Sequence, residues 1–362
     1  MIAKFGVDSA TPLTSPPAFP RSAPSRATAS PIMMRRLLLI LCLGATPLLA
    51  QTSSTSASSA TRRPGEYSHG PDSQQHADVP SGKLLGPFEW HSRVMAGTVR
   101  RYWIFVPAQY TGTTSACLLV FQDGQRATSM TPNAALRVPI VMANLIHKRE
   151  MPVTIGLFVT PGNTTEHYPD TLGMSNPNHR AEEYDVLSDA YARMLIEELI
   201  PEISKTYRIT ENPDGRVIGG TSSGAIAAWT VAWERPDQFR KGISIVGSYT
   251  SIAYRPARGN QPMAPGGDLY PTLIRKSPIK PIRVFLQDGS RDLNNQHGDW
   301  FLGNQQMLAA LEFANADADR KRVGGARYDI NHVWGDGEHS DGHGGTLLPD
   351  ILRWMWRDWR TP

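Results

Sequence analysis

Cysteine is scarce in this sequence of 362 residues, which contains only two. Cys42 lies within the first 50 residues, and Cys117 lies in the apolar run at 116–121. Two cysteines cannot build the framework of bridges that staples a small secreted fold, so the sequence excludes that class. We expect Cys117 to serve as a small buried apolar side chain rather than as a nucleophile.

Beyond residue 50 the sequence has no excess of either charge sign. The formal net charge of +4 arises in residues 1–50, which hold five basic side chains and one acidic one, whereas the rest of the chain balances. A nucleic-acid-binding protein carries a basic patch or stripe, so we expect no nucleic-acid partner. With 40% apolar and 19% charged residues, the composition is that of a globular protein.

Long hydrophobic runs are also missing. The longest apolar stretch, MRRLLLILCLGATPLLA at 34–50, is too short to span a membrane comfortably. Its two leading arginines, short apolar core and final Ala50 are typical of a secretory signal peptide. We therefore predict a signal peptide at 34–50, an upstream extension of undefined role at 1–33, and a flexible Ser/Thr/Pro-rich tether at 51–82. A cleaved leader predicts a secreted or periplasmic protein without a stable membrane anchor.

From residue 83 to its end, the sequence alternates apolar strand-like runs with amphipathic helix-like segments. Short continuous apolar runs are typical of strands that are buried on both faces. We expect one α/β domain over 83–362, with a mostly parallel sheet, antiparallel N-terminal strands and helices on both faces. The expected strands lie at 88–92, 99–106, 118–122, 153–159, 216–219, 242–246, 282–286 and 327–334. The expected helices lie at 134–147, 184–207, 223–233, 300–313 and 347–356.

The sharpest signal is the pentapeptide GTSSG at residues 220–224, a G-x-S-x-G motif between an expected strand and an expected helix. A strand-to-helix turn of this kind holds a serine hydroxyl above the sheet, and its glycines let two backbones approach closely. Ser222 is the serine in register, so we predict that it is a nucleophile. The alternative is a tight packing turn whose serine only caps the helix.

Candidate partners for Ser222 follow the later strands, in the order serine, acid, histidine that α/β-hydrolases use. Asp288 and Asp292 follow one late strand, and His339 and His343 follow the last one. We predict that His339 is the general base and that Asp292 orients it. Asp288 is the alternative acid, and His343 is the alternative base.

Negative charge that develops on an attacked carbonyl oxygen needs backbone N–H donors. In this topology one donor is the N–H after the nucleophile, here Ser223. The second comes from the loop after the strand at 118–122, near Gly124 and Gln125. Backbone donors need no particular side chain, so the sequence predicts the region and not the individual group.

Several segments together resemble the esterase family that includes enterochelin (ferric siderophore) esterases, S-formylglutathione hydrolase and feruloyl esterases. The resemblance runs from about residue 101 to residue 356 and includes YWIFVPAQY, LLVFQDGQ, GGTSSGAIAAWTVAW, FLQDGSRDL and GDGEHSDGHGG. It implies an α/β-hydrolase fold and serine ester hydrolysis without a metal or an organic cofactor. Carried over by position, Ser222 matches the nucleophile, His339 the base and Asp292 the acid. Some siderophore-esterase relatives act with a Ser–His pair alone, which leaves the role of the acid open.

Three other interpretations start from the same residues. The acidic and histidine side chains within 336–343 could bind a metal ion, although the glycines among them favour a polar loop. The chain could be an inactive binding module, with Trp300, Trp334 and the loop 161–183 lining a cleft. An acyltransferase would use the same nucleophile and the same acyl-enzyme.

The residues favour an exported serine carboxylic-ester hydrolase, because a complete set of candidate catalytic side chains is present. We expect it to act, without a cofactor, on a small-molecule or polysaccharide-linked ester. A siderophore ester and an acetyl or feruloyl ester of a carbohydrate both suit an exported enzyme. The loop 161–183 is long and polar, and long loops are often functional, so we expect it to border the substrate cleft.

Overall fold

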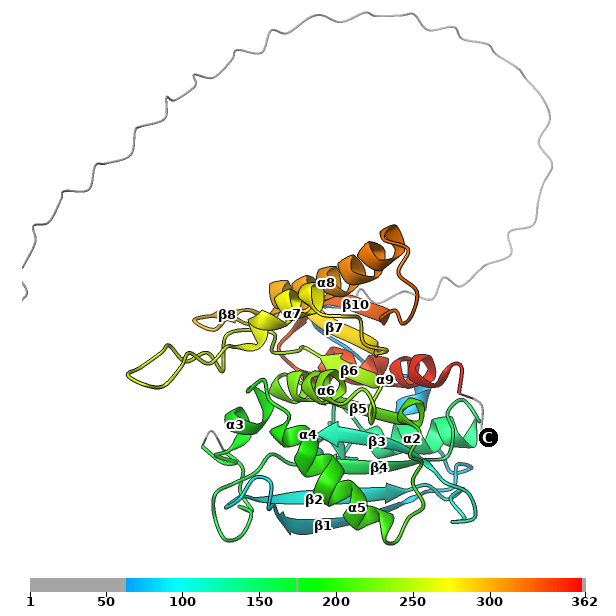
Figure 1. The fold of residues 1–362 in the computed structure, drawn as a ribbon. Helices are drawn as coiled ribbons and strands as arrows, with labels where there is room; N and C mark the ends of the chain where they lie inside the picture. Colours follow the sequence, from blue (N-terminus) through cyan, green and yellow to red (C-terminus); the bar gives the residue numbers. More distant parts are fainter. Residues whose placement is uncertain (1–62, 174, 360–362) are drawn as a thin grey trace, which may run out of the picture. The chain divides into compact units, whose positions relative to one another are not determined.

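The computed structural model describes residues 63–173 and 175–359, and the predicted signal peptide and upstream extension lie outside them. Its central sheet has the strand order β1-β2-β4-β3-β5-β6-β7-β10 (Figure 1). The β1–β2 and β2–β4 pairs are antiparallel, and all further neighbours are parallel. The predicted class, a mostly parallel sheet with antiparallel N-terminal strands, is confirmed. No helix of the described residues is long and apolar enough to cross a membrane.

The elements have the following bounds. The strands of the central sheet are β1 (Lys83–His91), β2 (Val99–Val106), β3 (Cys117–Gln122), β4 (Thr154–Val159), β5 (Arg216–Thr221), β6 (Lys241–Ile245), β7 (Arg283–Arg291) and β10 (Asp329–Glu338). A short hairpin pairs β8 (Asn294–Asn295) with β9 (Gly298–Asp299). The α-helices are α1 (Gly124–Ala127), α2 (Val138–His147), α3 (Arg180–Tyr184), α4 (Ala190–Met194), α5 (Ile200–Ser204), α6 (Ser223–Glu234), α7 (Tyr270–Lys276), α8 (Trp300–Arg320) and α9 (Asp341–Trp356).

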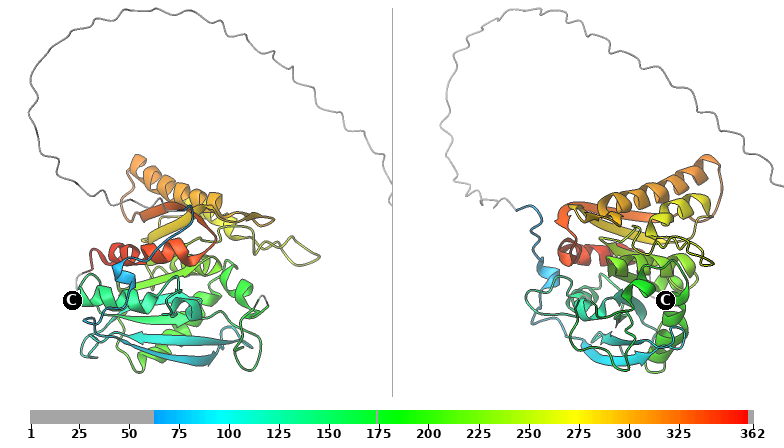
Figure 2. Two further views of the ribbon diagram at one scale, coloured as in Figure 1. Left: turned by 180° about the vertical axis from the view of Figure 1, so that it is seen from behind. Right: turned by 90° about the vertical axis from the view of Figure 1, so that its left-hand side faces the viewer.

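Helices cover both faces of the sheet. Alternate side chains of β3 separate the two layers: Leu119 and Phe121 pack with α2 and α9, whereas Leu118 and Val120 pack with α4–α5 and α6. The left view of Figure 2 shows α2 in teal and α9 in red on the first face. Near β7, α7 and α8 extend the second layer. Burial on both faces explains why these strands are continuously apolar instead of alternating with polar residues.

The helix predicted over 184–207 is divided in the structure. α3 ends at Tyr184, and a second helical stretch runs from Ala190 through a π-helical turn (Leu195–Leu199) to Ser204. A buried ion pair between Glu183 of α3 and Arg100 of β2 holds α3 against the sheet. The continuous helix therefore begins at Ala190 and not at residue 184.

The last helix also differs from its prediction, because α9 begins at Asp341 and not at residue 347. The side chain of Ser340 accepts a hydrogen bond from the Gly342 N–H and so caps the helix. Of the glycines that favoured a loop, those at 342, 344 and 345 lie in this helix, and close neighbours leave no room for a side chain at 344 and 345. A Cβ on Gly345 would lie 1.8 Å from the carbonyl oxygen of Ala135.

The folded part begins before residue 83, so the prediction of a tether over the whole of 51–82 is wrong for its second part. Residues 63–82, here called the N-terminal strap, lie along the domain. Asn144 Nδ2 donates to the carbonyl oxygens of Asp72 and Gln74, both at 2.8 Å, and Arg137 Nη1 donates to the carbonyl of Ser73 at 3.1 Å. These contacts are polar, so the strap lacks the apolar pattern that would predict packing.

Candidate active site

Ser222 occupies a sharp turn between β5 and α6. Its backbone angles, φ 61° and ψ −124°, are rare for a residue with a side chain. The turn needs its glycines because neighbours leave no room for side chains: a Cβ on Gly220 would lie 2.4 Å from the carbonyl carbon of Gly224, and a Cβ on Gly224 would lie 2.9 Å from Cβ of Gln122. The Ser222 N–H donates to the carbonyl of Ile245 at 2.9 Å, which ties the turn to β6.

The structure brings Ser222, His339 and Asp292 into one hydrogen-bonded chain. His339 Nε2 lies 2.7 Å from Ser222 Oγ, and His339 Nδ1 lies 2.6 Å from Asp292 Oδ1. The Asp292 side chain is fully buried, and that of His339 is 20% exposed. An ionised Asp292 can only accept, so it fixes the imidazole proton on Nδ1 and leaves Nε2 to accept the proton of Ser222.

Asp288, the alternative acid, contacts other groups. Its Oδ1 accepts from the Gly289 N–H and its Oδ2 accepts from Asn304 Nδ2, both at 2.6 Å. Burial, together with the hydrogen bond and the charge of Asp292, raises the pKa of Asp288 to about 9. A neutral Asp288 can donate its proton to Asp292, whose Oδ2 has no other partner among the described residues. Asp288 therefore supports the acid and does not contact the histidine itself.

His343, the alternative base, faces the N-terminal strap. Its ring stacks on Tyr67 with the centroids 4.1 Å apart, and its Nδ1 lies 3.0 Å from Gln287 Nε2. The neighbouring acids also diverge, because Asp336 accepts from the Tyr67 hydroxyl at 2.7 Å and Asp341 pairs with Arg126 at 3.4 Å. No three acidic, histidine or cysteine side chains of the described residues converge as a metal-binding group.

The predicted backbone donors lie at the starts of two helices. Ser223 is the first residue of α6, and Gly124 and Gln125 are the first residues of α1, where N–H groups have no intrahelical acceptor. Gln125 lines the same pocket as Ser222. Gly124 packs beneath it against β4, where a Cβ would lie 2.6 Å from the carbonyl carbon of Phe158.

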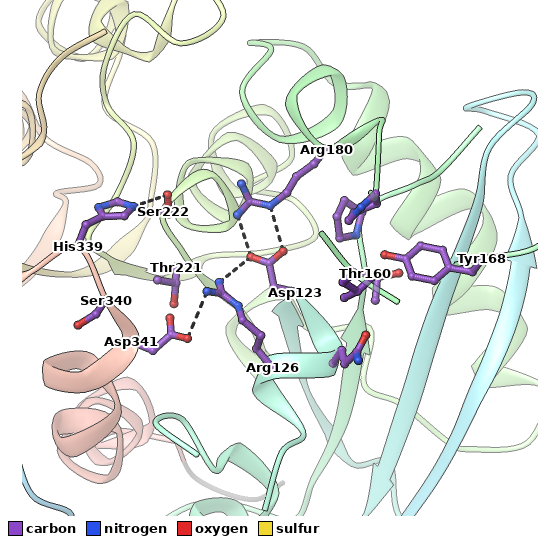
Figure 3. Close-up of a pocket in the computed structure, with 14 residues that line it drawn as sticks. Asp123, Arg126, Thr160, Tyr168, Arg180, Thr221, Ser222, His339, Ser340 and Asp341 are labelled. Atoms are coloured by element: carbon purple, nitrogen blue, oxygen red, sulfur yellow. Dashed lines mark hydrogen bonds and ion pairs between the residues drawn. The ribbon is translucent and has the colours of Figure 1, made fainter. Parts of the chain in front are cut away.

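A pocket of about 320 Å³ opens beside Ser222 and combines apolar side chains with paired charges (Figure 3). Arg180 binds Asp123 with two hydrogen bonds of 2.9 and 3.1 Å, and Arg126 contacts Asp123 at 3.1 Å and Asp341 at 3.4 Å. Burial opposes ionisation of Asp123, but the two guanidinium groups lower its pKa below the ordinary value. Each arginine is thus matched by a carboxylate. The pocket is lined by Asp123, Gln125, Arg126, Thr160, Pro161, Tyr168, Leu172, Pro177, Arg180, Thr221, Ser222, His339, Ser340 and Asp341.

The loop 161–183 borders this pocket, as predicted, and a buried ion pair secures it. The side chains of Arg100 and Glu183 are both 0% exposed and meet at 2.8 Å. Glu183 also accepts from the Gly162 N–H at 3.0 Å and contacts His179 Nδ1 at 3.1 Å. Both ends of the loop are therefore attached to one carboxylate.

Sequence reasoning missed a second hydroxyl at the nucleophile. Ser248 Oγ lies 3.2 Å from Ser222 Oγ, and Trp300 Nε1 donates to Ser248 Oγ at 3.0 Å. Ser248 belongs to no motif, but it follows β6 at the edge of the sheet where parallel strands place their ligands. Its position directly after a parallel strand was the one feature of the sequence that could have marked Ser248 as a site residue.

Comparison with known proteins gives matches over most of the domain. Residues 92–336 match the sequence model of the family described as "Putative esterase". Iron(III) enterobactin esterase of Escherichia coli (strain K12) is 25% identical over 221 residues, which cover 61% of this chain and 48% of that protein. The chain thus spans about half the length of that curated relative, and 38% of its counterpart from Escherichia coli O6:H1.

Two solved structures share the fold. The enterobactin esterase from Shigella flexneri, in the presence of 2,3-di-hydroxy-N-benzoyl-serine, has a TM-score of 0.54 and 22% identity, over 78% of this chain and 61% of that chain. A ferulic acid esterase from Anaeromyces mucronatus, in complex with ferulic acid, has a TM-score of 0.52 and 14% identity, over 77% and 92%. The fold is that of the α/β-hydrolase esterases. Since the family match covers more than half of the sequence, this chain belongs to that esterase family.

Proposed function

We propose that this protein is a serine carboxylic-ester hydrolase in which Ser222 is the nucleophile. The observation that carries the proposal is the continuous hydrogen-bonded chain from Asp292 through His339 to Ser222, set in a strained strand-to-helix turn beside a pocket. Backbone strain of this kind is kept where it has a function. Membership of the esterase family supports the same chemistry.

In the proposed acylation, Ser222 Oγ attacks the ester carbonyl while its proton passes to His339 Nε2. The resulting oxyanion accepts hydrogen bonds from the Ser223 N–H and from the start of α1. His339 then protonates the leaving alcohol. Water repeats the sequence on the acyl-enzyme and releases the acid. Asp292 stays ionised throughout and holds the imidazole in the productive tautomer.

For the substrate, we propose an ester that carries a single aromatic group. A volume of about 320 Å³ lies at the small end of ligand pockets, roughly 300–1,000 Å³, so it suits one ring better than a long chain. The two solved relatives were studied with 2,3-di-hydroxy-N-benzoyl-serine and with ferulic acid, which are single-ring compounds. An acetyl group would leave most of the pocket empty, so siderophore and feruloyl esters are favoured over acetyl esters.

The first test is covalent labelling with a fluorophosphonate probe, followed by intact-mass measurement and peptide mapping. We expect one adduct per chain, on Ser222, and no adduct on the Ser222→Ala variant. Ser204→Ala is the matched control, because Ser204 is exposed at the end of α5. A folded protein that takes no adduct, or a Ser222→Ala variant with full esterase activity, would refute the proposal.

The role of the acid is tested separately with Asp292→Asn. An amide at this position donates to Nδ1 and favours the wrong tautomer of His339, so kcat should fall about 10⁴-fold. A loss below tenfold would mean that a Ser–His pair suffices. A panel of siderophore, feruloyl and acetyl esters then ranks the substrates, and added alcohol acceptors separate hydrolysis from acyl transfer.

We also propose that the protein is exported. The signal-peptide pattern at 34–50 supports this, and cell fractionation with N-terminal sequencing of the mature chain is the test. A mature chain that begins after residue 50, outside the cytoplasm, is the expected result. Cytoplasmic protein with an intact leader would contradict it.

A further inference from the structure

We propose that Ser248 is a further catalytic residue, whose hydroxyl donates a hydrogen bond to Ser222 Oγ as Ser222 is released from the acyl-enzyme. This inference rests on the proposed function and deepens it. Ser248 lies in the loop after β6, outside the GTSSG motif and outside the loops that carry His339 and Asp292.

Ser248 links the nucleophile to Trp300, the first residue of α8, through two hydrogen bonds. Its Oγ lies 3.2 Å from Ser222 Oγ and accepts from Trp300 Nε1 at 3.0 Å. Ser248 is 1% exposed and Trp300 is 3% exposed. The ring of Trp300 also meets His339 edge-on, with the centroids 5.7 Å apart. Ser248 is therefore reached from the protein interior, whereas Ser222 lines the pocket.

The direction of the contact follows from counting protons. The single proton of Ser222 Oγ goes to His339 Nε2, because Nδ1 carries its proton toward Asp292. Ser222 then has no proton left for Ser248. The indole N–H of Trp300 is only a donor, so it occupies a lone pair of Ser248 Oγ. The proton of Ser248 is thus left to point at Ser222 Oγ.

The backbone holds Ser248 in this place at the expense of strain. Val246 has φ 42°, an outlier for a β-branched residue, and its N–H donates to the carbonyl of Gln287 at 2.7 Å. The next carbonyl, of Gly247, accepts from Asn304 Nδ2 at 2.8 Å. The Ser248 N–H donates to the carbonyl of Ser222 at 3.3 Å. Strained positions persist only where the surrounding structure over-determines them, as it does here.

The chemistry makes this donor most useful in deacylation. Water adds to the acyl carbon and gives a proton to His339 Nε2; the bond from the acyl carbon to Ser222 Oγ then breaks. Its electron pair stays on Oγ, which takes the proton back from Nε2. Ser248 keeps its own proton and stabilises the negative charge that builds on Oγ while the bond is breaking.

Acylation gains less from the same contact. Before acylation Ser222 Oγ is a hydroxyl oxygen and already accepts the hydrogen bond from Ser248. In the acyl-enzyme Oγ is an ester oxygen, which is a weaker acceptor, so the hydrogen bond strengthens mainly on the way to the deacylation transition state. Only an interaction that is stronger in the transition state than in the preceding state speeds a step. Loss of Ser248 should therefore slow deacylation more than attack.

The test compares two reactions of Ser248→Ala. With a p-nitrophenyl ester the phenolate leaves readily, so deacylation limits kcat; we expect kcat to fall about tenfold with a full burst of p-nitrophenolate. Labelling by a fluorophosphonate needs only attack by Ser222, and its rate should change less than about threefold. Trp300→Phe keeps an aromatic side chain but removes the donor to Ser248, so it should also lower kcat, by less than Ser248→Ala does.

The matched control is Ser244→Ala, another buried serine near the end of β6, whose hydroxyl contacts Tyr249 and not Ser222. Its kcat should stay within about twofold of the wild type. An unchanged kcat in Ser248→Ala overturns the inference, as does a labelling rate that falls as far as kcat. If Ser248→Ala does not fold, Trp300→Phe decides. A wild-type protein that neither labels nor hydrolyses the ester would refute the proposed function instead.

Discussion

Replacement of Asp288 with asparagine tests whether a neutral side chain supports the acid of the site. The Asp288 side chain is buried between the Gly289 N–H, Asn304 and Asp292. Asparagine has nearly the same shape, offers an N–H to Asp292 and cannot ionise, but its amide nitrogen cannot accept from Asn304 Nδ2 as Asp288 Oδ2 does. We expect Asp288→Asn to fold and to keep kcat within several-fold, unlike a substitution of Asp292 itself.

The effect of Asp288 on the free energy of unfolding depends on pH. Burial, followed by the hydrogen bond and charge of Asp292, raises the pKa of Asp288 from 3.8 to about 9 in the folded protein. Between these values the folded state holds one proton more than the unfolded state, so stability falls as pH rises. The slope from this group is at most about 1.4 kcal/mol per pH unit, and Asp288→Asn removes it.

Urea denaturation at pH 6 and pH 8 measures this effect. The wild type should lose up to about 3 kcal/mol more than Asp288→Asn between the two pH values, because all other titrating groups are shared. Asp78→Asn, at an exposed position in the N-terminal strap, should follow the wild-type curve. Wild-type and Asp288→Asn curves that run parallel from pH 6 to pH 8 would refute the idea that Asp288 is a buried neutral acid.

Two further predictions concern the supports of the site. Tyr67→Phe removes the hydroxyl that donates to Asp336 at 2.7 Å and accepts from its N–H at 3.1 Å, so the unfolding free energy should fall by about 1–3 kcal/mol. The kcat should also drop, because Asp336 lies near the end of β10, shortly before His339; unchanged denaturation and kcat would contradict this. Glu183→Gln leaves the charge of the buried Arg100 unpaired, so the unfolding free energy measured by urea denaturation should fall by about 3–5 kcal/mol. The double variant Arg100→Met with Glu183→Leu should recover most of this loss. A double variant as unstable as Glu183→Gln would contradict the prediction.

The parts of the site that the sequence predicts are those that local rules dictate. The GTSSG turn needs glycine at the positions where neighbouring atoms approach most closely, so the motif itself predicts the geometry of the turn. His339 and Asp292 follow strands of a parallel sheet, and the ends of such strands gather at one edge. Short apolar runs between turn residues were enough to predict the strands and, through them, the order of the site.

The parts that the sequence does not predict depend on tertiary contacts between polar groups. Asp288 lies near the end of β7 and Asp292 directly follows it, both side chains are buried, and only the contact with His339 tells them apart. The strap binds through carbonyl oxygens and isolated side chains such as Tyr67, which carry no periodic pattern. The helix predicted at 184–207 begins at Ala190, and the ion pair that joins Glu183 of the preceding turn to Arg100 links distant segments that a local window cannot detect.

The order of the strands explains why a residue after β6, such as Ser248, lies close to the nucleophile. The strands β5, β6, β7 and β10 are neighbours in that order, and the loops after β5, β7 and β10 carry Ser222, Asp292 and His339. The loop after β6 lies between the loops that carry the nucleophile and the acid, and its Ser248 comes within 3.2 Å of Ser222. An apolar residue there would only pack. A serine that accepts from Trp300 Nε1 and directs its own proton at Ser222 Oγ, as we propose, gives the same loop a role in the reaction.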